Sequence, residues 1–112
     1  MKKILLDTSF FIDCIDYKID FYDEFKYLFG NYKIIVTKAV LNEIKKLKLE
    51  KFLKDFEVVD VGEKNADRSI LKFALNEKNL IVATNDKELR NIFKKNKIKT
   101  IYIRSLKKIC LG

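Results

Sequence analysis

Short apolar runs alternate along the chain with longer segments in which apolar side chains recur every three or four residues. The short runs cover 4–6, 34–36, 58–61, 80–83 and 100–103, and each is long enough for one buried strand. Helical spacing predicts helices over about 10–15, 21–29, 40–47, 65–77 and 86–93, with a short helical stretch near 49–54. Strands that are apolar on both faces and separated by helices are typical of a mainly parallel sheet that is covered on two sides.

The pattern therefore predicts an α/β fold: a three-layer α/β/α sandwich in one domain spanning 1–112. We expect a five-stranded sheet with the doubly wound order 3-2-1-4-5. Thr37 is placed to cap the helix that follows the second strand. Asn85 with Glu88 resembles a capping box for the helix that runs through Phe93. The segment 105–112 is open to two readings, a tail or an edge element.

Charge is unevenly distributed along the chain. The formal net charge is +8, and the segment 86–112 carries nine basic and two acidic side chains, so the rest of the chain is close to neutral. A basic region attracts phosphate backbones through counterion release. A solvated, lysine-rich surface explains the same charge equally well.

Missing residue types exclude several kinds of site. The chain has no histidine, which excludes a Ser-His-Asp triad and any zinc site with a histidine ligand. Cys14 and Cys110 lie far apart in the sequence, and buried thiols are the favoured interpretation, although a disulfide stays open. Glycine-rich nucleotide-binding loops are absent. No apolar run is long enough for a membrane span, and Asp7 follows the start too soon for a signal peptide, so we expect a cytoplasmic protein with no membrane partner.

Four carboxylates stand where such a fold would bring them together. Asp7 follows the first strand and Asp86 follows the fourth, and these strands are neighbours where the winding of the sheet reverses. Glu43 and Asp67 lie in early helical turns beside apolar stripes. Carboxylates gathered in one place repel one another, and a hard divalent cation with oxygen ligands relieves that repulsion.

Each acid also has an ordinary structural explanation. Asp7 could cap a helix, Asp67 and Asp86 could favour a helix dipole from the first turn, and Glu43 could pair with Lys46. Placement of all four together favours a functional site. The acids without such placement are interpreted as surface charge: Asp13, Asp16, Asp20, Asp23, Glu24 and Glu50.

Segments around these acids resemble the motifs of PIN-domain nucleases. They read ILLDTSFFI at 4–12, VLNEI at 40–44, NAD at 65–67 and ATNDKEL at 83–89. The first and last are fairly specific, whereas the glutamate segment alone is weak. The resemblance spans nearly the whole chain. Residues 83–102 look more like small archaeal PIN proteins related to ribosomal-RNA processing nucleases than like VapC-type toxins.

The resemblance implies a Mg²⁺- or Mn²⁺-dependent endoribonuclease that cleaves single-stranded RNA and leaves 5′-phosphate and 3′-hydroxyl ends. Asp7, Asp67 and Asp86 would bind metal, and Glu43 would bind metal or orient the water. We expect three hydroxyls to support the acids, those of Thr8, Ser9 and Thr84, although the first two are equally plausible helix caps. The candidates for contact with the RNA backbone, with solvated helix surface as the equal alternative, are Lys87, Arg90, Lys94 and Lys95.

One departure from the family pattern bears on activity. Related sequences often carry another acid directly after the third one, where this chain has Arg68. Two alternatives therefore stay open: a VapC-type toxin held by an antitoxin protein, and an RNA-binding or assembly module that turns over poorly. A homodimer is common in the family.

Overall fold

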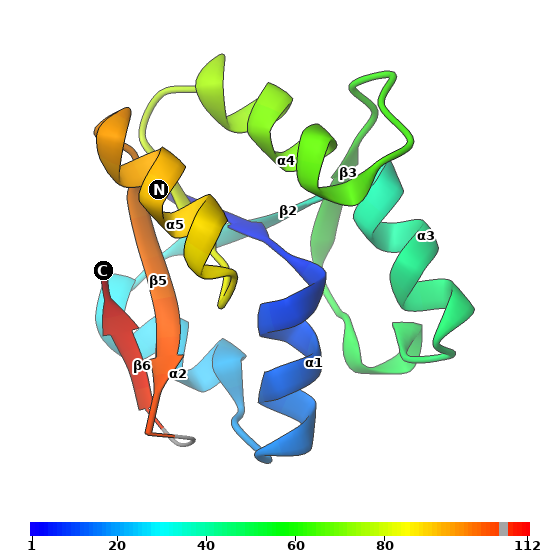
Figure 1. Cartoon of the computed structure of the whole chain (residues 1–112). Helices are drawn as coiled ribbons and strands as arrows, with labels where there is room; N and C mark the ends of the chain where they lie inside the picture. Colours follow the sequence, from blue (N-terminus) through cyan, green and yellow to red (C-terminus); the bar gives the residue numbers. More distant parts are fainter. Residues whose placement is uncertain (106–107) are drawn as a thin grey trace.

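A six-stranded sheet forms the centre of the computed structural model, which describes residues 1–105 and 108–112 (Figure 1). The strands are β1 (Lys2–Leu6), β2 (Tyr32–Thr37), β3 (Phe56–Val59), β4 (Leu80–Ala83), β5 (Lys99–Arg104) and β6 (Lys108–Leu111). Their order across the sheet is β3-β2-β1-β4-β5-β6. β1 to β5 pair in parallel, and β6 pairs antiparallel with β5.

Helices cover both faces of this sheet and complete three layers. They are α1 (Thr8–Asp16), α2 (Phe21–Phe29), α3 (Lys38–Lys46), α4 (Ala66–Leu75) and α5 (Lys87–Lys95), with a short 3₁₀ turn, η1 (Glu50–Phe52). Figure 1 shows α4 and α5 on one face, and α1, α2 and α3 on the other. Right-handed crossovers between parallel strands require this division, because the chain winds first toward β3 and then back toward β5.

The α/β fold and the order 3-2-1-4-5 that the sequence predicts are confirmed, and β6 is an addition to the predicted five strands. The segment 105–112 thus supplies an edge strand through its described residues 108–111. The central strands are apolar on both faces because both faces are covered: residues 4–6 and 81–83 expose 3% or less of their surface. The aromatic side chains of α1 and α2 fill one layer of the core, namely Phe10, Phe11, Phe21 and Phe25.

Polar residues at the ends of the strands start the helices that follow them. The side chain of Thr37 accepts a hydrogen bond from the Val40 backbone, as predicted for a cap. The predicted Asn85–Glu88 capping box is wrong. Asp86 caps α5, because its Oδ1 accepts from the backbone N–H groups of Glu88 and Leu89 at 2.9 and 3.2 Å. The cap moves by one residue since Asn85 is used in contacts with α1 and β5.

Among the described residues, no helix is long and apolar enough to cross a bilayer.

Candidate functional site

Asp7 occupies the carboxyl end of β1, at the centre of the sheet. Leu6 pairs with Ala83 on the neighbouring strand, and the Asp7 backbone N–H donates to the Ala83 carbonyl at 3.0 Å. Asp7 and Thr84 therefore leave adjacent strands at the same edge. Only 3% of Asp7 is exposed, so the protein holds a carboxylate at a buried strand end.

Two hydroxyls converge on a single oxygen of that carboxylate. Thr84 Oγ1 donates to Asp7 Oδ2 at 2.6 Å, and Ser9 Oγ donates to the same atom at 2.9 Å. The Thr84 hydroxyl in turn accepts from the Asp86 backbone N–H at 3.1 Å. Within the described part of the chain, no side chain donates to Asp7 Oδ1. The two hydroxyls thus anchor one oxygen, and the other has no side-chain donor among the described residues.

Burial raises the pKa of Asp7 above its ordinary value, and the nearby charge of Asp67 raises it further. Hydrogen bonds from Thr84, Ser9 and the Thr8 backbone oppose the shift, because they stabilise the ionised form. The site consequently favours a proton, or a cation, on Asp7.

Asp86 stands at the start of α5, and its backbone N–H is linked to the Asp7 carboxylate through the Thr84 hydroxyl. Its role as N-cap uses Oδ1, and no described residue donates to Oδ2. The structural explanation for this acid is therefore correct for one of its two oxygens. The other oxygen is available for a second role at the same edge of the sheet.

Glu43 reaches the site from α3 through a contact with α1. Thr8 Oγ1 donates to Glu43 Oε1 at 2.7 Å, so the residue next to Asp7 holds this glutamate. An ion pair between Glu43 and Lys46, the alternative explanation from the sequence, does not occur among the described residues. The hydroxyls of Thr8 and Ser9 contact acids, and neither caps α1.

Asp67 completes the group from the first turn of α4. Partial desolvation raises its pKa, and the charges of Asp86, Glu43 and Glu88 raise it further, in that order. Its side chain is largely exposed, so solvent screens these charges. Together with the effect of Asp67 on Asp7, the directions of these pKa shifts indicate that the four predicted acids face one region of the protein.

A buried pair of hydroxyls aligns the two helices that carry Glu43 and Asp67. Ser69 Oγ donates to the Ala66 carbonyl at 2.6 Å, which leaves the Thr37 hydroxyl to donate to Ser69 Oγ at 2.8 Å. Thr37 also caps α3, so one contact fixes the starts of α3 and α4 side by side. The sequence reading missed Ser69, because nothing in its local pattern marks it.

The four acids are not already closed into a metal cage. Among residues 1–105 and 108–112, no group of three or more acidic or thiol side chains is positioned to hold an ion together. The donor chemistry nevertheless fits a hard divalent cation: every donor is a carboxylate oxygen, and the anchored acids each keep one oxygen without a side-chain donor. Binding would therefore require the acids to move closer together.

Asn85 and Asp13 form a brace that the sequence reading missed. Asn85 Nδ2 donates to Asp13 on α1, and Asn85 Oδ1 accepts from the Ile103 backbone N–H on β5 at 2.9 Å. The Asn85 backbone also donates to Ser9 Oγ at 3.3 Å. Asp13 is thus not the surface charge that the sequence suggested. The helical spacing of Ser9 and Asp13, four residues apart on one face, was the available signal.

The predicted RNA-contact residues divide into two kinds. Lys87, Lys94 and Lys95 lie on the exposed surface of α5. Arg90 is half-buried, and its guanidinium carbon lies 4.1 Å from the centroid of the Tyr102 ring. Exposure of the lysines fits both RNA contact and the solvated helix surface that the sequence offered as the alternative, whereas Arg90 is held against an aromatic ring.

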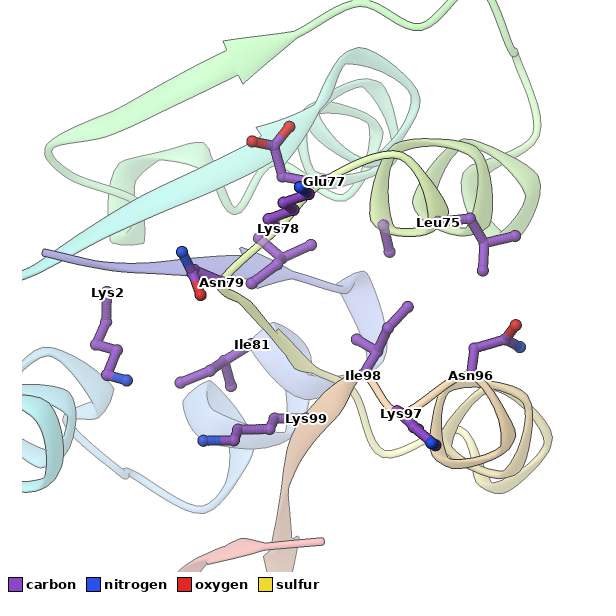
Figure 2. A pocket seen from close by; sticks show the side chains of 12 residues that line it. Lys2, Leu75, Glu77, Lys78, Asn79, Ile81, Asn96, Lys97, Ile98 and Lys99 are labelled. Atoms are coloured by element: carbon purple, nitrogen blue, oxygen red, sulfur yellow. The ribbon is translucent and has the colours of Figure 1, made fainter.

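A separate hollow of about 500 Å³ lies at the opposite edge of the sheet (Figure 2). Lys2 and Lys99 flank Ile81 there, and Lys97 follows the end of α5. None of the four acids lines it. Chemistry by these carboxylates therefore belongs to the carboxyl edge of the strands and not to this hollow.

Comparisons with known proteins agree with this geometry. A family model described as a PIN like domain matches residues 4–106. The chain is 31% identical to Ribonuclease VapC4 of Methanocaldococcus jannaschii, over 96% of this chain and 94% of that protein. The solved structure of the PIN domain endonuclease Utp24 aligns with a TM-score of 0.84 at 24% identity, over 98% of this chain and 90% of that one, which is a likeness of fold.

Proposed function

Because the chain belongs to the family of PIN-like domains, we propose that it is a metal-dependent endoribonuclease acting on single-stranded RNA. The observation that carries the proposal is the buried carboxylate of Asp7 at the end of β1, which Ser9 and Thr84 hold through one oxygen. The Thr84 hydroxyl also accepts from the Asp86 backbone, so two acids are tied to one edge of the sheet. A buried carboxylate is costly unless a proton or a cation compensates its charge. We further propose that the enzyme acts in RNA processing.

Each acid has a defined part in the proposal. Asp7, Asp67 and Asp86 would hold Mg²⁺ or Mn²⁺, and Glu43 would bind the metal or orient the attacking water. The bound cation would supply an acidified water and charge neutralisation at the phosphate. Thr8, Ser9 and Thr84 would keep the carboxylates in position through the hydroxyl contacts described above.

Charge on α5 supports the choice of an anionic polymer as substrate. Lys87, Lys94 and Lys95 lie along the helix that begins at Asp86, so a phosphate backbone could follow α5 away from the acids. Cleavage is expected to leave 5′-phosphate and 3′-hydroxyl ends. Arg68 is exposed and forms no ion pair with Asp67 among the described residues.

The direct test is cleavage of end-labelled single-stranded RNAs of varied sequence. We expect cutting with Mn²⁺ or Mg²⁺, none with a chelator, and a loss of at least about a hundredfold in Asp7→Asn. Asp16→Asn, at the exposed end of the same helix, is the matched control and should cut normally. Equal cutting in chelator would contradict the metal mechanism, and RNA binding without cutting across all substrates would favour the assembly-module alternative.

A second candidate function is a ribonuclease held inactive by a partner protein. The similarity to Ribonuclease VapC4 over nearly the whole chain favours it. Growth arrest on expression of the chain alone, relieved by a neighbouring gene product that binds it, would support this alternative. Normal growth during expression of an active enzyme would oppose it. The predicted homodimer stays a separate prediction, to be tested by mass in solution.

A further inference from the structure

Arg90 is the one predicted RNA-contact residue whose side chain is held in place by the fold. It lies four residues after Asp86, and its backbone N–H donates to the Asp86 carbonyl at 3.0 Å. Residues four apart on a helix lie one above the other, about 5–6 Å apart. The Arg90 side chain therefore leaves α5 one helical turn after Asp86.

Tyr102, on which this guanidinium rests, is level with the loop that carries the acids. Its neighbour Ile101 accepts from the Thr84 backbone N–H at 3.0 Å, and Ile103 donates to the Asn85 side chain at 2.9 Å. The Arg90–Tyr102 pair therefore lies beside the β4–α5 loop, one strand away from β4. Neither Arg90 nor Tyr102 lines the hollow shown in Figure 2.

One nitrogen of the Arg90 guanidinium is buried, which indicates how the group is oriented. Its Nε atom is buried and has no hydrogen-bond partner among the described residues. Within the described part of the chain, no carboxylate pairs with Arg90, although the protein has 16 acidic residues. An aromatic ring, which leaves the positive charge available, fixes this arginine instead.

The orientation suits a tetrahedral oxyanion. With Nε directed inward, the two terminal nitrogens form the part of the guanidinium that can meet a ligand. A planar fork of two N–H donors matches phosphate oxygens, and a lysine ammonium cannot reproduce it. Stacking on Tyr102 restricts the rotamers of the arginine before binding, which reduces the entropy lost when the ligand arrives.

We propose that Arg90, held against Tyr102, is a bidentate clamp for a phosphodiester group of the RNA strand, next to the phosphate that the acids address. The inference rests on the proposed ribonuclease function and deepens it. Arg90 would make one planar contact with phosphate at a fixed place. The RNA backbone would be attracted less specifically by Lys87, Lys94 and Lys95. The alternative is a purely structural tie between α5 and β5, and the two differ in what a charge-conserving change does to RNA affinity.

The test measures binding of a fluorescent single-stranded RNA by anisotropy in Ca²⁺, over a range of salt, with gel analysis to verify that the RNA is intact. Arg90→Ala should weaken binding about tenfold. The slope of the logarithm of the binding constant against the logarithm of the salt concentration should become less steep by about 0.7, the value for one phosphate contact on a single strand. Arg90→Lys, which keeps the charge, should lose most of the same affinity. Tyr102→Phe should bind normally, and Tyr102→Leu should bind several-fold more weakly.

Lys26→Ala, on the exposed surface of α2, is the control for loss of one charge and should change affinity little. Melting temperatures verify folding, and Arg90→Lys changes shape so little that it decides the matter even if the larger changes unfold the chain. Parental affinity in Arg90→Lys would overturn the clamp, as would an equal loss in Lys26→Ala or no RNA binding by the parent. If the parent cleaves RNA and Arg90→Lys binds RNA with the parent's affinity, the clamp is wrong and the proposed nuclease function stands. If binding depends on Arg90 but the parent cleaves no RNA, the nuclease function is wrong and the clamp stands.

Discussion

The hydroxyl of Thr84 donates a 2.6 Å hydrogen bond to Oδ2 of Asp7, joining the ends of two neighbouring strands that lie 77 positions apart in the sequence. The same hydroxyl accepts from the Asp86 backbone, so one side chain links two of the proposed metal ligands. The contact also lowers the pKa of Asp7, opposing the rise that burial causes. Position and ionisation of the central carboxylate thus depend on the same threonine.

Thr84→Val should move the acid limb of the pH–activity profile to higher pH. Loss of the hydrogen bond removes a stabilisation of the ionised carboxylate, so the pKa of Asp7 rises further. A net hydrogen-bond energy of about 1 kcal/mol corresponds to a shift of roughly 0.5–1 pH unit. The pH dependence of kcat/KM with Mn²⁺ measures it. Thr100→Val, which removes an equally buried hydroxyl at the other end of the sheet, should leave the limb in place.

Asp7→Asn should stabilise the metal-free protein at neutral pH while abolishing cleavage. The folded state raises the pKa of Asp7 above its ordinary value of 3.8, so this carboxyl favours folding only while protonated. Its contribution is fully present below the unfolded pKa and is lost as pH rises through the folded pKa. The asparagine variant should therefore unfold at higher denaturant concentration than the parent at pH 7 in chelator.

That advantage should disappear near pH 3, where Asp7 is protonated in both states, and should shrink when Mn²⁺ is added, because the cation stabilises only the parent site. A variant less stable than the parent at pH 7 in chelator would show that burial of Asp7 is not a strain on the fold.

The brace between Asn85 and Asp13 should respond to exchange of the two residues. Asn85→Asp alone sets two carboxylates against each other and should lower kcat about tenfold or more at pH 7, by loosening the loop that carries Thr84 and Asp86. The double change Asp13→Asn/Asn85→Asp restores a donor opposite an acceptor, and the new carboxylate still accepts from the Ile103 backbone. We expect the double variant to recover most of the activity. No recovery in a folded double variant would show that the brace does not position the site.

Lys97 offers a test of backbone strain remote from the acids. It follows α5 with φ of 58°, a left-handed conformation, while Ile98 N–H donates to the Phe93 carbonyl at 2.9 Å to close the helix. Glycine adopts this conformation without a Cβ penalty, so Lys97→Gly should raise the free energy of unfolding by about 0.5–1 kcal/mol. Lys95→Gly, at the last residue of α5, should lower it by up to about 1 kcal/mol. Denaturant titration of both variants measures the difference, which a destabilised Lys97→Gly would contradict.

Much of the fold could be predicted because it follows from local pattern. Apolar runs at residues 4–6 and 80–83 predict strands that are buried on both faces. Because the two strands are parallel neighbours, Asp7 and Asp86 follow them at the same edge of the sheet. The helix after Thr37 follows from a cap that depends only on neighbouring residues.

What the sequence could not show depends on contacts between distant elements. Asn85 has the residue type of a cap, but contacts with Asp13 and Ile103 take it away from α5 and leave the cap to Asp86. Ser69 and Arg90 acquire their roles from Thr37 and Tyr102, which lie 32 and 12 positions away. Edge strand β6 has only four residues, so periodicity alone did not separate it from a tail.

A crystal of the protein soaked in Mn²⁺ would test the central claim most directly, through the anomalous scattering of the metal. We predict a peak bridged by Asp7, Asp67 and Asp86, with Glu43 coordinating it or contacting its water, and a clear loss of that peak in Asp7→Asn. A saturating soak that leaves the carboxyl edge of β1 and β4 without a peak, or that places the ion elsewhere, would contradict the account.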